Sequence, residues 1–288
     1  MNRVSLPTFD DAAAFLALSS NSRLKSYPEL QAIVPDVLDC YDTYMAAGGD
    51  PALVNNVILS DPIAGYLRDH YASPPRNVAY IRQMRDSTEH LVCPMCGSMH
   101  SGTLDHFLPK SVFPIFALFS KNLVPACKCN SKRNDVYVGA TQAERVLHPY
   151  FDNCLEERLV RAQFDDVCDI PRVSVALAIP NTHPYYPAVN FHVRSIVERS
   201  AIVRYLADRW SALYRKPSLV IRALGENPPT QADLAEILEE ERVALDDLHT
   251  SRNNWNSVFV SGLLQPHVLS WLMGRFSDPE RAPDGPLG

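Results

Sequence analysis

Two pairs of cysteines constrain the fold of this chain more than any other feature. Cys93 and Cys96 form the first pair, and Cys127 and Cys129 form the second. Thiolates at such short spacings can chelate one tetrahedral zinc ion, two from each pair. We therefore expect a structural zinc site that ties together the segments carrying the two pairs. Disulfides are not expected, because the chain has seven cysteines and no secretory apolar segment at its start.

The second pair is one residue tighter than the usual Cys-x-x-Cys spacing, so its bite on a metal should be strained. Three outcomes remain open from the residues. The knuckle is distorted but complete, His100 or Cys154 supplies a ligand in its place, or the site holds no metal.

Oxygen ligands and a histidine lie between and beside the cysteine pairs. Asp105 and His106 are adjacent, and Asn130 directly follows Cys129, the last residue of the second pair. Carboxylate and amide oxygens suit Mg²⁺ or Mn²⁺ and leave positions for water and phosphate. An imidazole titrates near neutral pH and can act as a general base. This set is suited to phosphodiester hydrolysis.

The order of these residues resembles that of the HNH (ββα-metal) nuclease family, in the variety with a zinc-binding cysteine knuckle on each side of the Asp-His pair. The matching motifs are Asp-His-x-x-Pro from Asp105, Asn-Leu from Asn122 and Cys-Asn-x-Lys from Cys129. They cover roughly 45 of the 288 residues. The chain departs from the family at the second knuckle, which normally reads Cys-x-x-Cys-Asn.

The resemblance implies a role for each residue. His106 would be the general base, Asp105 and Asn130 would hold the catalytic cation, and Asn122 would pin the hairpin loop that positions His106. Asn134 lies four residues after Asn130 and, on a continuous helix, would face the same site. The cationic residues near that helix should contact nucleic-acid phosphates; they are Lys110, Lys128, Lys132 and Arg133.

The net charge of −6 is unusual for a nucleic-acid enzyme, but its distribution is uneven. Residues 91–135 hold five cationic and two acidic side chains, so the remainder is strongly acidic. A locally basic face can bind phosphate while the rest repels it. We therefore expect a nucleic-acid substrate, DNA in preference to RNA. We also expect help from a protein partner such as a sensor or an ATPase subunit.

The fold class predicted is α+β and mainly helical. Residues 1–88 form an N-terminal helical region, 89–152 the zinc-stapled ββα nuclease core, 153–276 a β-hairpin with further helices, and 277–288 a disordered tail rich in proline and glycine. Helices are expected over 27–47, 52–71 with a break at Asp61-Pro62, and 190–214, and a hairpin over 157–164 and 172–179. No apolar run reaches the roughly 20 residues of a membrane span, so a cytoplasmic protein is expected.

Three functions fit the sequence. The first is a metal-dependent HNH endonuclease with a structural zinc and a catalytic Mg²⁺ or Mn²⁺. The second is the same nuclease as a subunit of a bacterial anti-phage defence or toxin complex, held inactive by its partner. The third is a zinc-knuckle module that binds nucleic acid without cleaving it.

Overall fold

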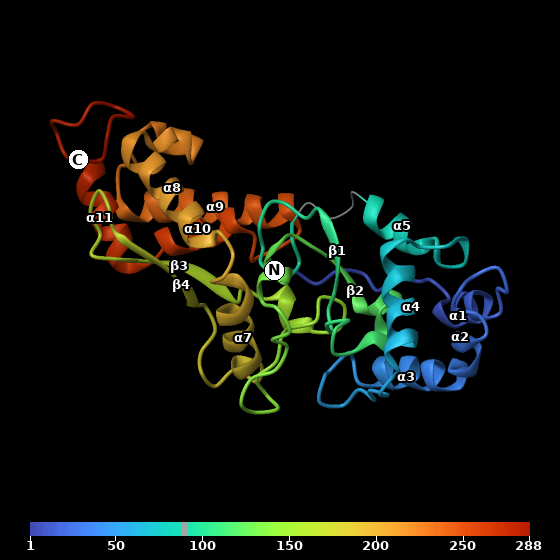
Figure 1. The fold of residues 1–288 in the computed structure, drawn as a ribbon. Coiled ribbons are helices and arrows are strands. Elements are labelled where there is room, and N and C mark those ends of the chain that lie inside the picture. The colour runs from blue at the N-terminus through green and yellow to red at the C-terminus, as the bar shows by residue number, and fades with distance from the viewer. Residues whose placement is uncertain (88–91) are drawn as a thin grey trace.

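Two short antiparallel strands lie near the middle of the computed structural model, which describes residues 1–87 and 92–288 (Figure 1). Strand β1 (Thr103–His106) pairs with β2 (Leu123–Ala126), with Asp105 opposite Val124. The short helix α6 (Cys129–Lys132) follows, which gives a strand–strand–helix order. The expected boundary between residues 88 and 89 lies outside the described residues.

The N-terminal helices lie together on one side of this hairpin (Figure 1). They are α1 (Asp11–Ser19), α2 (Glu29–Ala32), α3 (Val34–Ala46), α4 (Asp61–Ala72) and α5 (Tyr80–Asp86), with the 3₁₀ turn η1 (Arg76–Val78) before α5. The loop between β1 and β2 contains two more such turns, η2 (Pro114–Phe116) and η3 (Ser120–Asn122).

Helix α1 is fastened to that loop by a buried carboxylate. Asp11 accepts hydrogen bonds from the backbone and hydroxyl of Ser120, at 2.9 and 2.7 Å, and pairs with the Lys121 ammonium at 2.6 Å. A buried carboxylate with this many donors is fully compensated. The contact uses the charge of Lys121, which is therefore not available to a substrate.

The C-terminal half contains the second hairpin. This confirms the hairpin predicted over 157–164 and 172–179. Strand β3 (Val160–Asp165) pairs antiparallel with β4 (Arg172–Leu177). Around it lie α7 (Tyr186–His192), the π-helical turn η5 (Val193–Val197), α8 (Ile202–Arg215), α9 (Gln231–His249), α10 (Trp255–Leu263) and α11 (Pro266–Phe276). The 3₁₀ turns η4 (Asn153–Glu156), η6 (Pro217–Leu219) and η7 (Arg222–Gly225) connect them. The α+β, mainly helical class is confirmed.

Two of the predicted helices were wrong in their continuity. The 27–47 helix is divided at Ile33, because Pro35 has no N–H to donate and its ring clashes with the carbonyl four residues earlier. The 190–214 helix is interrupted between η5 and α8, where the Ser200 hydroxyl binds the backbone of Val197 and Ile202.

The predicted helix over 52–71 was half right. Its second part is α4, which begins at Asp61 as expected. Its first part is irregular, because the Asp50 carboxylate accepts from the Ala52 amide and the Asn56 side chain donates to the Val112 carbonyl. Such side-chain bonds to the backbone compete with helix formation.

The C-terminal segment 277–288 differs from its expected disorder. Leu287 is buried, and its amide donates to the carbonyl of Tyr214 in α8 at 2.8 Å. The Asp284 carboxylate accepts from the amide and hydroxyl of Ser218. The composition of the tail shows its prolines and glycines but not these tertiary contacts.

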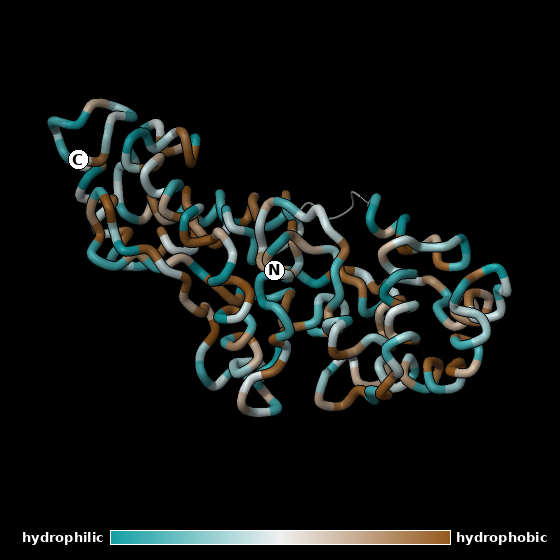
Figure 2. The backbone as a smooth tube through the Cα atoms, viewed as in Figure 1, coloured by the Kyte–Doolittle hydropathy of each residue, from teal (hydrophilic) through white to brown (hydrophobic). Residues whose placement is uncertain are grey.

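Hydrophobic and hydrophilic residues are interspersed along the described parts of the chain (Figure 2). Buried residues from the N-terminal helices, both hairpins and the C-terminal helices form one hydrophobic cluster. Within the described residues, no helix combines the length and apolar character needed to cross a membrane.

The first cysteine pair docks on the start of α10. The Trp255 indole donates to the carbonyl of Cys96 at 2.8 Å, and the Trp255 amide donates to that of Gly97 at 3.0 Å. Gly97 has φ +81°, and a Cβ there would lie 2.0 Å from the Asn253 carbonyl oxygen. Only glycine fits, since the left-handed backbone and the close approach both exclude a side chain.

We expect Gly97→Ala to destabilise the protein by about 3 kcal/mol or more, because backbone strain and a backbone clash act together. The control is Gly274→Ala in α11, where a Cβ would meet nothing within 4 Å. That variant should be unchanged or about 0.5–1 kcal/mol more stable. Chemical denaturation of both variants measures the difference, and equal stability would contradict the docking.

Candidate metal centre and active site

The four cysteines of the two pairs converge on one point. Their sulfur atoms all lie within 4.8 Å of one another, with Cys93 3.6 Å from Cys129 and Cys96 3.5 Å from Cys127. Sulfurs around a tetrahedral zinc are about 3.8 Å apart, given a bond of about 2.3 Å. The group could therefore hold a structural zinc ion.

The shortened second knuckle brings both of its sulfurs into the group. Cys127 directly follows β2, and Cys129 is the first residue of α6, so the turn between them supplies the bite. His100 and Cys154 are not members of the four-residue group found among the described residues. Of the predicted alternatives, the arrangement of four cysteines is the one that the structure shows.

Hydrogen bonds within the group favour the thiolate of Cys127, while the pKa values of Cys96 and Cys129 are raised. The Cys127 amide donates to the Cys93 sulfur, and the Cys129 amide donates to the Cys127 sulfur, each at 3.3 Å. Hydrogen bonds from Cys129 and the other two thiols hold the pKa of Cys127 well below its usual range. Donors to sulfur stabilise the thiolate, which is the form that binds zinc.

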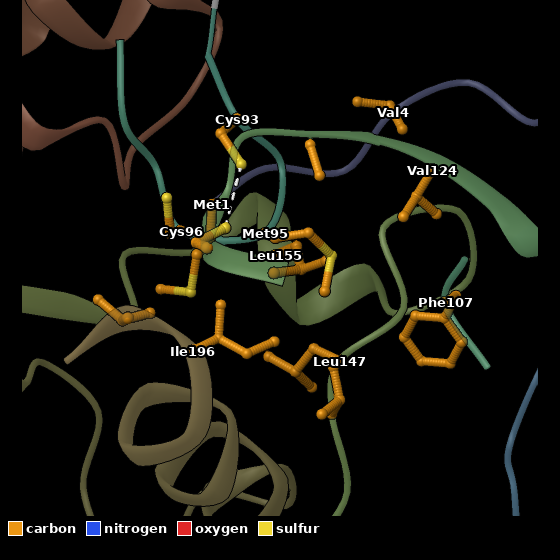
Figure 3. Packing of buried hydrophobic residues seen from close by; sticks show 14 of the residues in the cluster. Met1, Val4, Cys93, Met95, Cys96, Phe107, Val124, Leu147, Leu155 and Ile196 are labelled. Carbon is orange, nitrogen blue, oxygen red and sulfur yellow. Dashed lines mark hydrogen bonds between the residues drawn. The ribbon is translucent and has the colours of Figure 1, made fainter. Parts of the chain in front are cut away.

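Apolar packing surrounds the metal centre. Figure 3 shows Cys93 and Cys96 beside Met1 and Met95, with Leu147, Leu155 and Ile196 close by. All of these residues are buried. Their exclusion of water favours a closed, structural site.

Asp105 and Asn130 meet at the open side of the first hairpin. The Asn130 amide donates to the Asp105 carboxylate at 2.9 Å and to the His106 carbonyl at 3.1 Å. Its Oδ1 atom is buried and has no hydrogen-bond partner in the described structure. An orphaned buried acceptor beside a carboxylate is costly unless something binds it. The pair is chemically suited to a hard cation such as Mg²⁺ or Mn²⁺.

His106 is the last residue of β1 and is 3% exposed. Its Nε2 lies 3.0 Å from the Ala117 carbonyl and donates to it, so Nδ1 carries the lone pair that can accept a proton. Burial lowers the pKa of His106 to about 4, so the ring is neutral at neutral pH. The Tyr71 ring packs against it, with centroids 4.2 Å apart.

Asn122 fastens the hairpin loop, as its predicted role requires. Its amide donates to the carbonyls of Leu108 and Phe116 at 3.2 Å, and its oxygen accepts from the Leu108 amide at 2.7 Å. The side chain is fully buried. Asn122 therefore shapes the segment after His106 and does not reach the open side of the site.

Arg133 was predicted as a phosphate contact, and the structure corrects this. It is 1% exposed and donates to the carbonyls of His106, Phe107 and Val136. The carbonyls of His106 and Phe107 lie at the end of β1, so the guanidinium adds donors to the backbone there. Arg133 therefore helps to position His106 through its backbone carbonyl.

The expected position of Asn134 also needed correction. Helix α6 ends at Lys132, and Asn134 has φ +53°, so it does not continue the helix face of Asn130. It nevertheless lines the same pocket of about 300 Å³ as Asp105 and His106. Lys110 lines this pocket too, while Lys128 and Lys132 are exposed around α6.

Sequence reasoning missed the contribution of the N-terminal helices to this pocket. Arg68 of α4 lines it. Tyr71, one turn further along α4, carries Lys110 over its ring at 4.5 Å and Arg85 at 4.4 Å. Cation–π contacts of this kind hold the ammonium in place. The helical spacing of Arg68 and Tyr71 was the available signal for a place in the site. The same spacing is equally typical of a helix with a purely structural role.

Comparison with known proteins gives one distant relative. The chain is 28% identical over 163 residues to "Protein ea31" of Escherichia phage lambda, an alignment that covers 55% of this chain and 50% of the phage protein. The chain thus spans about half the length of that relative. No protein-family model matches the chain. No solved structure matches it either.

From the group of four cysteines, we expect purified protein to contain one zinc ion per chain. Cys129→Ser should lose it and unfold the region around α6, because a structural zinc stabilises a small site by on the order of 10 kcal/mol. Cys168→Ser, a free thiol outside the cluster, is the control and should keep the metal. Metal analysis with thermal melting measures both. Undiminished zinc in Cys129→Ser would show that the short knuckle is not a ligand pair.

Proposed function

We propose that this protein is a metal-dependent endonuclease of the HNH type that hydrolyses phosphodiester bonds, with DNA as the favoured substrate. The observation that carries the proposal is the meeting of Asp105, His106 and the unpartnered Asn130 oxygen at one pocket. The strand–strand–helix order around it and the four-cysteine group support the same reading.

Each residue has a distinct part in the proposed reaction. Asp105 and Asn130 would hold a Mg²⁺ or Mn²⁺ ion, which would neutralise charge on the phosphoryl oxygens and assist the leaving oxygen. His106 accepts a proton from the attacking water at Nδ1, while its Nε2–H stays bound to the Ala117 carbonyl. Arg133 and Asn122 keep this imidazole in position through hydrogen bonds with the backbone of His106 and Leu108.

The substrate would enter over the exposed cations. Arg68 and Lys110 line the pocket, and Lys128 and Lys132 are exposed beside it on α6. These side chains can neutralise phosphates on both sides of the reacting one. Two of the five cations counted in 91–135 are engaged inside the protein, since Lys121 pairs with Asp11 and Arg133 is buried.

Control by a protein partner is a second part of the proposal. Helix α9 carries a run of exposed acidic residues, among them Glu236, Glu239 and Glu240, which a nucleic acid would avoid. Such a face is available to a regulatory subunit of a bacterial defence or toxin complex. Copurification from the native host, followed by a cleavage assay with and without the copurified protein, tests this.

We expect His106→Ala to abolish cleavage of plasmid DNA in Mg²⁺ or Mn²⁺, because a general base contributes roughly 10²–10⁴-fold. Asp105→Asn should also inactivate while nearly preserving shape. His183→Ala is the control, since His183 does not line the pocket and pairs with Glu157.

Zinc content and melting temperature of each variant separate lost chemistry from lost fold. Full activity in folded His106→Ala would end the assignment of the base. Wild-type protein that binds nucleic acid but never cleaves it would instead identify a zinc-knuckle binding module.

The docking surface predicts a salt effect. Lys128→Gln with Lys132→Gln should weaken DNA binding and flatten its dependence on the logarithm of salt concentration by up to about two units of slope. Arg23→Gln with Lys25→Gln changes the net charge equally at exposed positions in the N-terminal region and should leave the slope unchanged. Titrations at several salt concentrations give both slopes. Equal slopes for the two double variants would place the substrate on another face.

A further inference from the structure

Three arginines line a second pocket, of about 430 Å³, in the C-terminal half of the protein. They are Arg158, just before β3, Arg161 of β3 and Arg242 of α9. Ser261 and Gln265 lie on the same wall. These residues come from segments far apart in the sequence, and no motif connects them.

Several donors of the residues that line this pocket have no partner in the described part of the chain. The Nε atoms of Arg158, Arg161 and Arg242 are all buried, and none has a hydrogen-bond partner in the described part of the chain. The hydroxyl of Ser261 is in the same condition. A buried donor without a partner is costly, and three guanidinium Nε atoms and one hydroxyl belong to residues that line one pocket, which favours a shared acceptor.

The charges of the cluster do not balance. Arg158 pairs with Asp246 at 2.5 Å, and Arg242 pairs with Glu239. Arg161 donates to the Leu177 carbonyl at 2.5 Å and forms no ion pair with any described residue. Three guanidinium groups are thus offset by two carboxylates. No carboxylate is among the described residues that line the pocket itself.

The electrostatics agree with this excess of positive charge. Burial lowers the pKa of Arg158, Asp246 and Glu239 raise it, and Arg242 and Arg252 lower it. Arg242 is therefore close enough to repel Arg158 even though each has its own acidic neighbour. An anion placed between the guanidinium groups would relieve that repulsion.

We propose that this pocket binds the phosphate group of a nucleotide, either free or at the end of a strand. A phosphate offers enough oxygen atoms to accept from several guanidinium groups at once, whereas a carboxylate offers two. The volume is within the range of roughly 300–1,000 Å³ that small-molecule sites occupy, so a nucleoside attached to the phosphate has room. The proposal does not depend on the nuclease assignment.

The test is isothermal titration of the full zinc-loaded chain without Mg²⁺, using AMP and a short oligodeoxynucleotide with a 5′-phosphate or a 5′-hydroxyl. We expect AMP, or the phosphorylated oligonucleotide in preference to its hydroxyl counterpart, to bind. Arg161→Gln should weaken this binding about tenfold or more, because charged hydrogen bonds to phosphate contribute about 1.5–3 kcal/mol. The control is Arg172→Gln, an equal charge change on the neighbouring strand, which should alter it less than twofold.

The two probes distinguish a free nucleotide from the end of a strand. Binding of AMP identifies a free nucleotide as the ligand, and binding confined to the 5′-phosphorylated strand identifies a strand end. If Arg161→Gln melts at a lower temperature than the wild type, Arg242→Gln supplies the same test from α9. Absence of binding by both probes overturns the proposal. So does binding that survives Arg161→Gln but is lost in Lys110→Gln, because the phosphate would then occupy the first pocket.

Discussion

The convergence of four cysteine sulfurs organises the middle of this protein. One pair lies ahead of β1 and docks on α10, and the other links the end of β2 to the start of α6. A metal held by all four would therefore fix α6 against the hairpin and both against the C-terminal half. Structural zinc contributes on the order of 10 kcal/mol, as much as the entire stability of many domains. The position of Asn130, the second residue of α6, depends directly on that anchor.

Satisfied buried polar groups explain how the pocket beside the cluster keeps its shape. Asn122 donates to the carbonyl of Leu108, and Arg133 donates to the carbonyl of His106. Such hydrogen bonds hold one geometry, because breaking one of them leaves a buried group unpaired. The Asn130 Oδ1 and the Arg133 Nε are buried without a partner in the described part of the chain. An unpaired acceptor among paired neighbours is what a ligand site requires before its ligand arrives.

Local patterns in the sequence predicted the cysteine group, the Asp105–His106–Asn130 set and the second hairpin, because each depends on spacing along one or two short segments. The helix breaks near Pro35 and Ser200 each arise from a single residue, which the periodicity of the apolar side chains does not reveal. The burial of Arg133 was not predictable either, since a cation next to a lysine on a short helix usually faces solvent.

The arginine pocket shows a limit of another kind. Arg158 and Arg161 are near neighbours in the sequence, but Arg242 reaches them only because α9 packs against α10, which packs against β3. Nothing in the sequence predicts that packing. Likewise Arg68 reaches the first pocket only through the placement of α4. Tertiary contact, not sequence spacing, assembles both cationic surfaces.

The distribution of charge then connects the two pockets to the acidity of the whole chain. With a net charge of −6, the protein as a whole repels polyanions, so phosphate can be bound only where cations are held together locally. The structure also lowers the number of cations available near the pocket of Asp105 and His106, since Lys121 is paired and Arg133 is buried. Four exposed or half-buried cations remain there, namely Arg68, Lys110, Lys128 and Lys132. So few cations give weak non-specific affinity and a shallow salt dependence. Under the proposed function, productive binding of a nucleic acid would then require a cation at Asp105 and Asn130 as well, which would couple substrate affinity to the metal.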